Sequence, residues 1–181
     1  MNQLASSLDM FLLALVKSGI ATAYGLREKA GLSIGGTLPA LKRLEQRGLV
    51  SGGERLVRNK REFRLTARGR TALKAGLNQM LKQYQEQPPS DLESVLRVCS
   101  LAAAAGKRER AGNILRAAAL TRRGHLSPLT RGARQLPRGQ QLGDLYQHLL
   151  AGCDYARLAA EADFLEKCAV EIFTTATHRQ R

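Results

Sequence analysis

Four side chains close together in the sequence have the chemistry to read the edges of base pairs. They are Lys42, Arg43, Gln46 and Arg47. Their spacing places all four on the outer side of one helix, and their hydrogen-bonding groups match those that base pairs offer in the major groove of DNA. Thr37, at the expected start of that helix, would face the groove with them. The same pattern also fits the solvated face of an ordinary surface helix.

A second group of cations follows within a polar stretch of ten residues, 52–61. It consists of Arg55, Arg58, Lys60 and Arg61. Such side chains hold phosphates, and arginine is also favoured in a narrow minor groove. The alternative is a solvated hairpin loop. Because the stretch directly follows the basic helix, we interpret it as a wing that contacts DNA.

The cysteines and histidines are too scattered to form a catalytic or metal site. They are Cys99, Cys153, Cys168, His125, His148 and His178. No CxxC spacing occurs, and the acidic residues are spread over helix faces. We therefore expect no enzyme, no metal and no cofactor. The odd number of cysteines, each in an apolar helical pattern, predicts buried thiols in a reducing compartment.

Positive charge dominates the chain. The net charge is +14, and residues 1–75 hold 14 Lys or Arg against 5 Asp or Glu. An excess of this size attracts polyanions, either nucleic acid or an anionic membrane surface. Residues 1–18 lack a basic head, and their apolar run is too short to span a bilayer. We therefore expect no signal peptide, no membrane anchor and a cytoplasmic protein.

Helical periodicity predicts the elements that would position the cations. A first helix should run from about residue 4 to 17, and a second, shorter one over 23–30, with Thr22 as its N-cap and Gly31 as its stop. The basic helix follows. A helix, a short helix and a basic helix joined by glycines form the order of a helix-turn-helix.

The basic helix itself should start near Thr37, because Pro39 is tolerated best in a first turn. Gly48 should end it. Three leucines at three-residue steps would form the apolar stripe beneath the cations. They are Leu38, Leu41 and Leu44.

Two strands and one more helix complete the expected first domain. Residues 49–51 and 63–65 can pair as a hairpin, and a helix should follow over 67–85. Two consecutive prolines at 88–89 then break the chain. The expected domains are a winged helix-turn-helix with a two-stranded wing over 1–87, and a helical dimerisation domain over 88–181.

The second domain should end in a long helix over about 142–176. Before it, residues 121–141 contain glycines, prolines and five arginines but no acid, which predicts a long basic loop, either solvated or touching DNA. Apolar residues of the long helix recur at steps of three and four, at Leu142, Leu145, Leu149, Cys153, Ala156, Ala160, Phe164, Cys168 and Ile172. This stripe predicts a seam with a second copy. The alternative is a helix that closes its own bundle.

Motif residues between 12 and 73 resemble the PadR family of bacterial winged-helix transcriptional regulators. Members share a first helix that ends in Gly, a Tyr five residues later, a S-x-G-x-x-x-P-A-L-x-R-L-E helix, a G-L-[VI] strand start and R-L-T-x-x-G-R-x-x-L after the wing. The corresponding residues are Gly19, Tyr24, Ser33, Gly35, Pro39, Ala40, Leu41, Arg43, Leu44, Glu45, Gly48, Leu49, Val50, Lys60, Arg61, Phe63, Arg64, Leu65, Thr66, Gly69, Arg70 and Leu73. Leu38 departs from the usual Tyr, and Glu62 stands where members often have a second wing aromatic.

The resemblance implies a mainly α-helical homodimer that binds a promoter palindrome in double-stranded DNA, usually as a repressor. Residues 90–181 are only loosely similar to the helical dimerisation domain of longer members. Some members release DNA when they bind an apolar or phenolic ligand, although no residue here indicates one. The sequence thus predicts a DNA-binding transcriptional regulator; the alternative is a winged-helix module that binds protein or RNA without a specific DNA operator.

Overall fold

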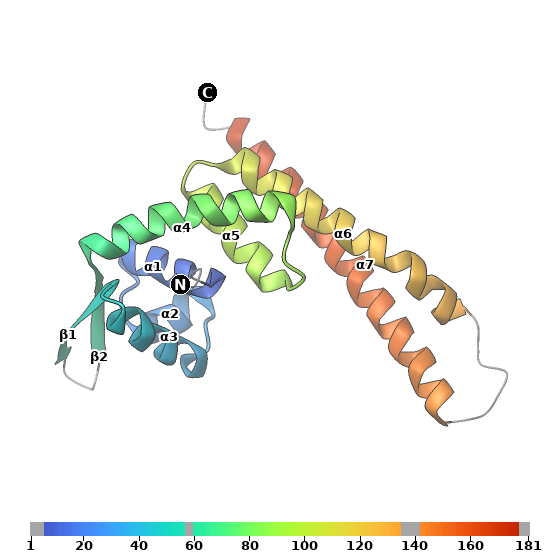
Figure 1. Ribbon diagram of the computed structural model, residues 1–181, viewed down its shortest axis with the longest axis horizontal. Helices are drawn as coiled ribbons and strands as arrows, with labels where there is room; N and C mark the ends of the chain where they lie inside the picture. The colour runs from blue at the N-terminus through green and yellow to red at the C-terminus, as the bar shows by residue number, and fades with distance from the viewer. Residues whose placement is uncertain (1–5, 57–59, 135–141, 178–181) are drawn as a thin grey trace. The chain divides into compact units, whose positions relative to one another are not determined.

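The computed structural model describes residues 6–56, 60–134 and 142–177. These residues form seven helices and a two-stranded sheet in the order α1–α2–α3–β1–β2–α4–α5–α6–α7 (Figure 1). The chain divides into two compact units, residues 1–82 and 83–181. The division falls inside α4, before the pair of prolines that was expected to mark it.

The first unit starts with three helices, α1 (Ser7–Lys17), α2 (Ala23–Ala30) and α3 (Ile34–Gln46). Each has an N-cap serine or threonine whose hydroxyl accepts a backbone N–H of the first turn, and these caps are Ser6, Thr22 and Ser33. The helix-turn-helix order is confirmed. Six large apolar side chains with no exposed surface form much of its core: Met10, Leu12, Leu13, Leu26, Leu41 and Leu44.

α3 starts earlier than the sequence predicted, and two of its side chains lie opposite to their expected positions. Ser33 Oγ accepts the Gly36 N–H at 3.3 Å, so the first turn precedes Pro39, which then lies inside the helix. Thr37, expected to face a groove, is 2% exposed, and Leu38, expected beneath the cations, is 39% exposed. Steps of three residues drift around a helix of 3.6 residues per turn, so Leu38 lies to the side of the buried face that Leu41 and Leu44 share.

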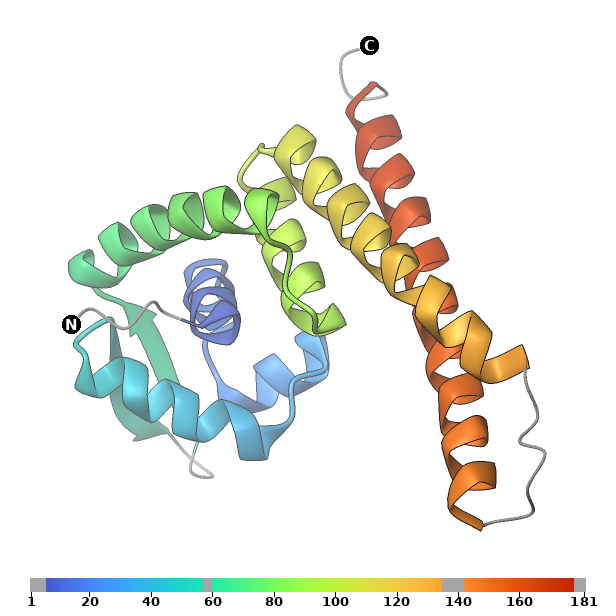
Figure 2. The same ribbon diagram turned by 45° about the vertical axis from the view of Figure 1, so that its right-hand side comes forward.

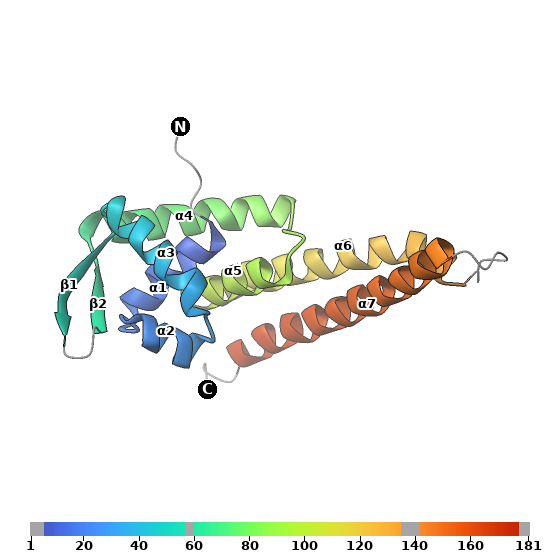
Figure 3. The same ribbon diagram turned by 90° about the horizontal axis from the view of Figure 1, so that it is seen from below.

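The wing is an antiparallel hairpin of β1 (Val50–Leu56) and β2 (Lys60–Leu65), seen beside the three helices in Figures 2 and 3. Its strands are longer than expected, and the register shifts between Gly52 and Arg55. The segment before α2 lies along β2, because the Phe63 N–H donates to the Ala21 carbonyl at 2.8 Å. The two-stranded wing of a winged helix is therefore confirmed.

Helix α4 (Ala67–Glu86) follows the wing, and a threonine caps its first turn. Thr66 Oγ1 accepts the Gly69 N–H at 2.9 Å and donates to the Gly48 carbonyl at 2.8 Å. The threonine thus joins the start of α4 to the turn that ends α3, where Gly48 has a φ of +67°. This contact fixes the end of α3 relative to the wing.

The second unit contains α5 (Leu92–Ala104), α6 (Arg108–Arg134) and α7 (Leu142–Thr177). α6 and α7 lie side by side as a helical hairpin in every view (Figures 1 and 3). The expected loop over 121–141 is wrong for residues 121–134, which continue α6 through Gly124 and Pro128. Packing along α7 outweighs the local preference of glycine and proline, and residues 135–141 lie outside the described part.

α7 agrees with the helix predicted over 142–176, and it packs chiefly against α6. Among the α7 residues whose side chains the structure describes, Ala162, Leu165 and Ala169 are buried, and none of these three belongs to the stripe that was assigned to a dimer seam. Leu149 and Phe164 of that stripe are instead 61% and 46% exposed. Among the described residues, no helix is long and apolar enough to cross a membrane.

Candidate nucleic-acid interface

The two flanks of α3 are both held by ion pairs, and the row between them points outward. The inner side of α3 is buried: Ala40, Leu41 and Leu44 are each at most 2% exposed. Arg43 and Arg47 lie on the flank toward α1, and Glu45 lies on the flank toward the wing. Successive turns of the outer row carry Leu38, Lys42 and Gln46, four residues apart.

On the first flank, the Asp9 carboxylate of α1 binds both arginines of α3. Arg43 Nη2 donates to Asp9 Oδ1 at 2.5 Å, and Arg47 Nη1 lies 3.6 Å from Asp9 Oδ2. The Asp9 side chain is 4% exposed, whereas the two arginines are 49% and 41% exposed. Asp9 also lies in the first turn of α1, where the helix dipole favours a negative charge. The guanidinium groups therefore lie at the surface with a buried anion behind them.

On the second flank, Glu45 joins α3 to the wing. Arg61 Nη1 and Nη2 donate to the two Glu45 carboxylate oxygens at 3.0 and 2.7 Å, and the Gly52 N–H donates to Oε1 at 3.0 Å. The Arg61 guanidinium also lies 5.5 Å from the centre of the Phe63 ring. A Cβ on residue 52 would come within 2.4 Å of Arg61 Nε, so Gly52 is needed for this close approach.

The outer row of α3 is free of such restraints. Lys42 and Gln46 are exposed, and neither side chain makes a hydrogen bond or ion pair within the described part of the chain. Leu38 is exposed one turn earlier, and Ile34, at the start of the helix, is 37% exposed. The row offers one ammonium, one amide and an apolar surface, which are the groups that distinguish base pairs in a major groove.

The structure separates the residues that the sequence grouped together. Thr37 does not face outward with the other predicted residues, because it is buried and its hydroxyl donates to the Ser33 carbonyl at 2.7 Å. Arg61, expected to hold phosphate, is half-buried in its contact with Glu45. Arg55 and Lys60 lie on the strands of the wing and not in its tip, and Arg55 is paired with Arg61 in the strand register. Arg58 lies outside the described residues.

Sequence reasoning missed both carboxylates that hold the cations of this surface. Asp9 lies 34 residues before Arg43, and Glu45 lies 16 residues before Arg61. No spacing rule links residues so far apart. The only available signal was that residues 1–75 contain few acids, so each of them had many possible cationic partners.

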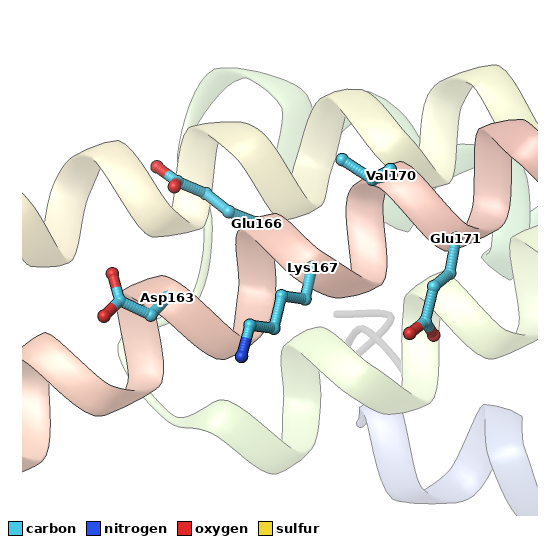
Figure 4. A pocket seen from close by; sticks show the side chains of 5 residues that line it. All are labelled: Asp163, Glu166, Lys167, Val170 and Glu171. Atoms are coloured by element: carbon cyan, nitrogen blue, oxygen red, sulfur yellow. The ribbon is translucent and has the colours of Figure 1, made fainter.

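A hollow in the second unit is lined mainly by residues with charged side chains. It has a volume of about 460 Å³ and is lined by five residues of α7, Asp163, Glu166, Lys167, Val170 and Glu171 (Figure 4). Four of the five are charged, and Arg123 of α6 forms ion pairs with Asp163 and Glu166 at 3.1 and 2.8 Å.

The cysteines differ from the expected set of buried thiols. Cys99 is buried, Cys168 is partly buried and Cys153 is exposed. Burial, and secondarily the nearby Cys168, raises the pKa of the Cys99 thiol to about 12, so Cys99 remains protonated and unreactive near neutral pH. Within the described ranges, no group of three or more His, Cys, Asp or Glu could hold a metal ion.

Comparison with known proteins found similarity at the level of solved structures alone. No protein-family model and no curated protein matches the chain. Among solved structures, the chain is similar to PadR of Bacillus subtilis, crystallised in complex with operator DNA. The identity is 20%, the match covers 91% of this chain and 98% of that one, and the TM-score is 0.35. At this level, the likeness assigns no ligand or function to this chain.

Proposed function

We propose that the protein is a DNA-binding transcription regulator of the PadR type, with α3 inserted in the major groove. One observation carries the proposal: Leu38, Lys42 and Gln46 form an exposed row on a helix whose two flanks are fixed by ion pairs. A reading helix must be held rigidly, because direct readout depends on fixed donor and acceptor positions. The motif resemblance supports the same assignment.

Phosphate contacts would come from the flanks of this surface. Arg43 and Arg47 retain exposed N–H groups beyond those that face Asp9, and Arg55 and Lys60 belong to the strands of the wing. Arg58, which lies outside the described residues, is proposed for the same role from its place in the sequence. These cations would set affinity and salt dependence. The outer row would set sequence preference. In this assignment Arg61 joins the wing to α3 and does not hold phosphate.

A homodimer is part of the proposal. The predicted seam stripe of α7 is exposed at Leu149 and Phe164, and Tyr146 and Leu150 beside it are 62% and 41% exposed. A row of large apolar side chains on a long helix fits the same row of a second copy around a two-fold axis. Two copies would read two half-sites of a palindrome and thereby multiply affinity. Repression and release by a small effector remain proposals from the resemblance alone.

The decisive test is a selection of bound duplexes from a random pool at fixed salt, with the full chain. We expect an enriched palindromic sequence, and a log–log plot of affinity against salt with a steep negative slope. Lys42→Ala and Gln46→Ala should each weaken binding to the selected duplex by about 1–3 kcal/mol more than binding to random duplex. Recovery of no sequence would contradict the proposal and favour the alternative module that binds protein or RNA.

A matched control is available in the same unit. Lys74→Ala removes one exposed cation from α4, and we expect it to lower the affinity for selected and random duplexes equally, if at all. Sedimentation at the working concentration should give the mass of two chains. A mass of one chain would contradict the proposed dimer but not the proposed role of α3 in reading DNA.

A further inference from the structure

Asp9 is the buried anion of the candidate DNA-binding surface, although it lies on a different helix from the reading row. Its carboxylate has only 4% of its side-chain surface exposed. A desolvated carboxylate requires a cation and hydrogen bonds, since burial without them is strongly unfavourable. Arg43 supplies both at 2.5 Å, and Arg47 supplies a second, looser charge at 3.6 Å.

The difference in burial determines which partner holds the other. Arg43 and Arg47 are about half exposed and could rotate into solvent, whereas Asp9 cannot leave the first turn of α1, where its own N–H donates to Ser6 Oγ at 3.1 Å. The fixed carboxylate therefore defines the position of two mobile cations. Arg43, with the shorter contact, is the more strongly restrained.

We propose that Asp9 is a positioning residue for DNA recognition, which holds the guanidinium groups of Arg43 and Arg47 against α1. This inference rests on the proposed function. With Asp9 present, each guanidinium can use only its remaining N–H groups, in a fixed direction, so it contacts a phosphate only when the duplex lies in the correct register. Without Asp9, both side chains reach phosphates of any sequence.

Removal of the negative charge of Asp9 should therefore strengthen binding to duplexes that lack the selected sequence. Asp9→Asn keeps the shape and an acceptor oxygen but removes the negative charge. We expect its affinity for random duplex to rise severalfold, with a salt slope steeper by about one unit for each additional phosphate contact. Affinity for the selected duplex should rise less or fall, so the ratio of the two affinities should decline.

Two matched variants separate positioning from a general change of charge. Glu28→Gln removes an exposed carboxylate of α2 and should leave the affinity ratio unchanged. In a background of Arg43→Gln, Asp9→Asn should lose most of its effect, because its principal partner is absent. A purely structural role for Asp9 would instead lower binding to both duplexes in proportion to the folded fraction, which thermal unfolding measures.

A third variant covers the case in which Asp9→Asn does not fold. Arg43→Lys retains the cation at the exposed end of the pair but loses the planar fork, so the affinity ratio should fall while the salt slope stays near that of the parent chain. An unchanged ratio in Arg43→Lys or in folded Asp9→Asn, with a parent that selects a sequence, overturns the positioning role alone. A parent that selects no sequence overturns the proposed function and this inference together.

Discussion

Each unit of the molecule has an arginine–carboxylate pair between helices, but the two pairs are buried in opposite senses. In the first unit, the Asp9 side chain is 4% exposed and Arg43 is 49% exposed. In the second, Arg122 is 4% exposed and Glu161 is 16% exposed. A buried anion presents its cation to the surface, where a phosphate can bind. A buried cation presents nothing to a polyanion, and its role is to hold helices together.

The surroundings of Arg122 agree with a structural role. Its Nε donates to Glu161 of α7 at 2.6 Å, Nη1 donates to the Ala118 carbonyl at 3.2 Å, and Nη2 donates to the Ser90 carbonyl at 2.8 Å. One guanidinium thus joins α6, α7 and the segment before α5. The positive charge of this residue is cancelled inside the unit and contributes little to attraction of DNA.

Among the variants that test this difference between the two pairs, Arg122→Ala should cause the largest loss of stability. The substitution removes one donor from Glu161 and one from each of two carbonyls, and removal of one partner of a buried pair costs about 3–5 kcal/mol. We expect the lower end, because Arg157 also binds Glu161 at 3.2 Å. Urea unfolding followed by circular dichroism measures the loss.

The neighbouring residue provides the control. Arg123→Ala removes two surface pairs, to Asp163 and Glu166, whose shared arginine is 47% exposed, and each such pair contributes at most about 1 kcal/mol. Equal losses of stability for the two variants would mean that burial does not distinguish them, and the contrast between the two units would fail.

Much of the fold follows from periodicity and capping residues. Thr22, Gly31 and Thr66 bound helices where the sequence placed those bounds, because a cap is a local hydrogen bond. The failures arise where packing or a competing cap decides. Residues 121–134 stay helical against α7 despite Gly124 and Pro128, and Ser33 starts α3 before Pro39.

The candidate site was predictable in its composition but not in its contacts. The cations of α3 could be placed on an outer face from their spacing alone. Which of them are tethered depends on Asp9 and Glu45, whose partners lie far away in the sequence. The exposure of Leu38 follows from the drift of three-residue steps around a helix, which places Leu38 to the side of the buried Leu41 and Leu44.

The pair between Glu45 and Arg61 is intermediate in burial, at 28% and 39% exposed, and it should be intermediate in energy. Glu45→Gln loses the charged pair but can still accept the Gly52 N–H, so we expect about 1 kcal/mol of destabilisation. Hydrogen exchange should accelerate at Gly52 and the start of β1. Glu62→Gln, on the paired strand, should leave that exchange unchanged; a similar acceleration there would show that any loss of negative charge loosens the wing.

The smallest effect concerns the apolar member of the outer row. Leu38 is the exposed side chain one turn before Lys42, and the apolar group that a major groove offers it is the C5 methyl of thymine. Replacement of one thymine by uracil in the selected half-site removes only that methyl. Burial of one such group is worth about 0.8 kcal/mol, or roughly a fourfold change in affinity.

A double-substitution cycle assigns that methyl to its partner. In the parent chain, uracil at one position should weaken binding by this amount, and in Leu38→Ala the same exchange should have no effect. Lys42→Ala should bind more weakly overall yet remain sensitive to the methyl, because its contact is with a different atom. If Leu38→Ala stays sensitive to uracil at every thymine of the half-site, Leu38 does not face the groove, and the outer row of α3 reads bases only through Lys42 and Gln46.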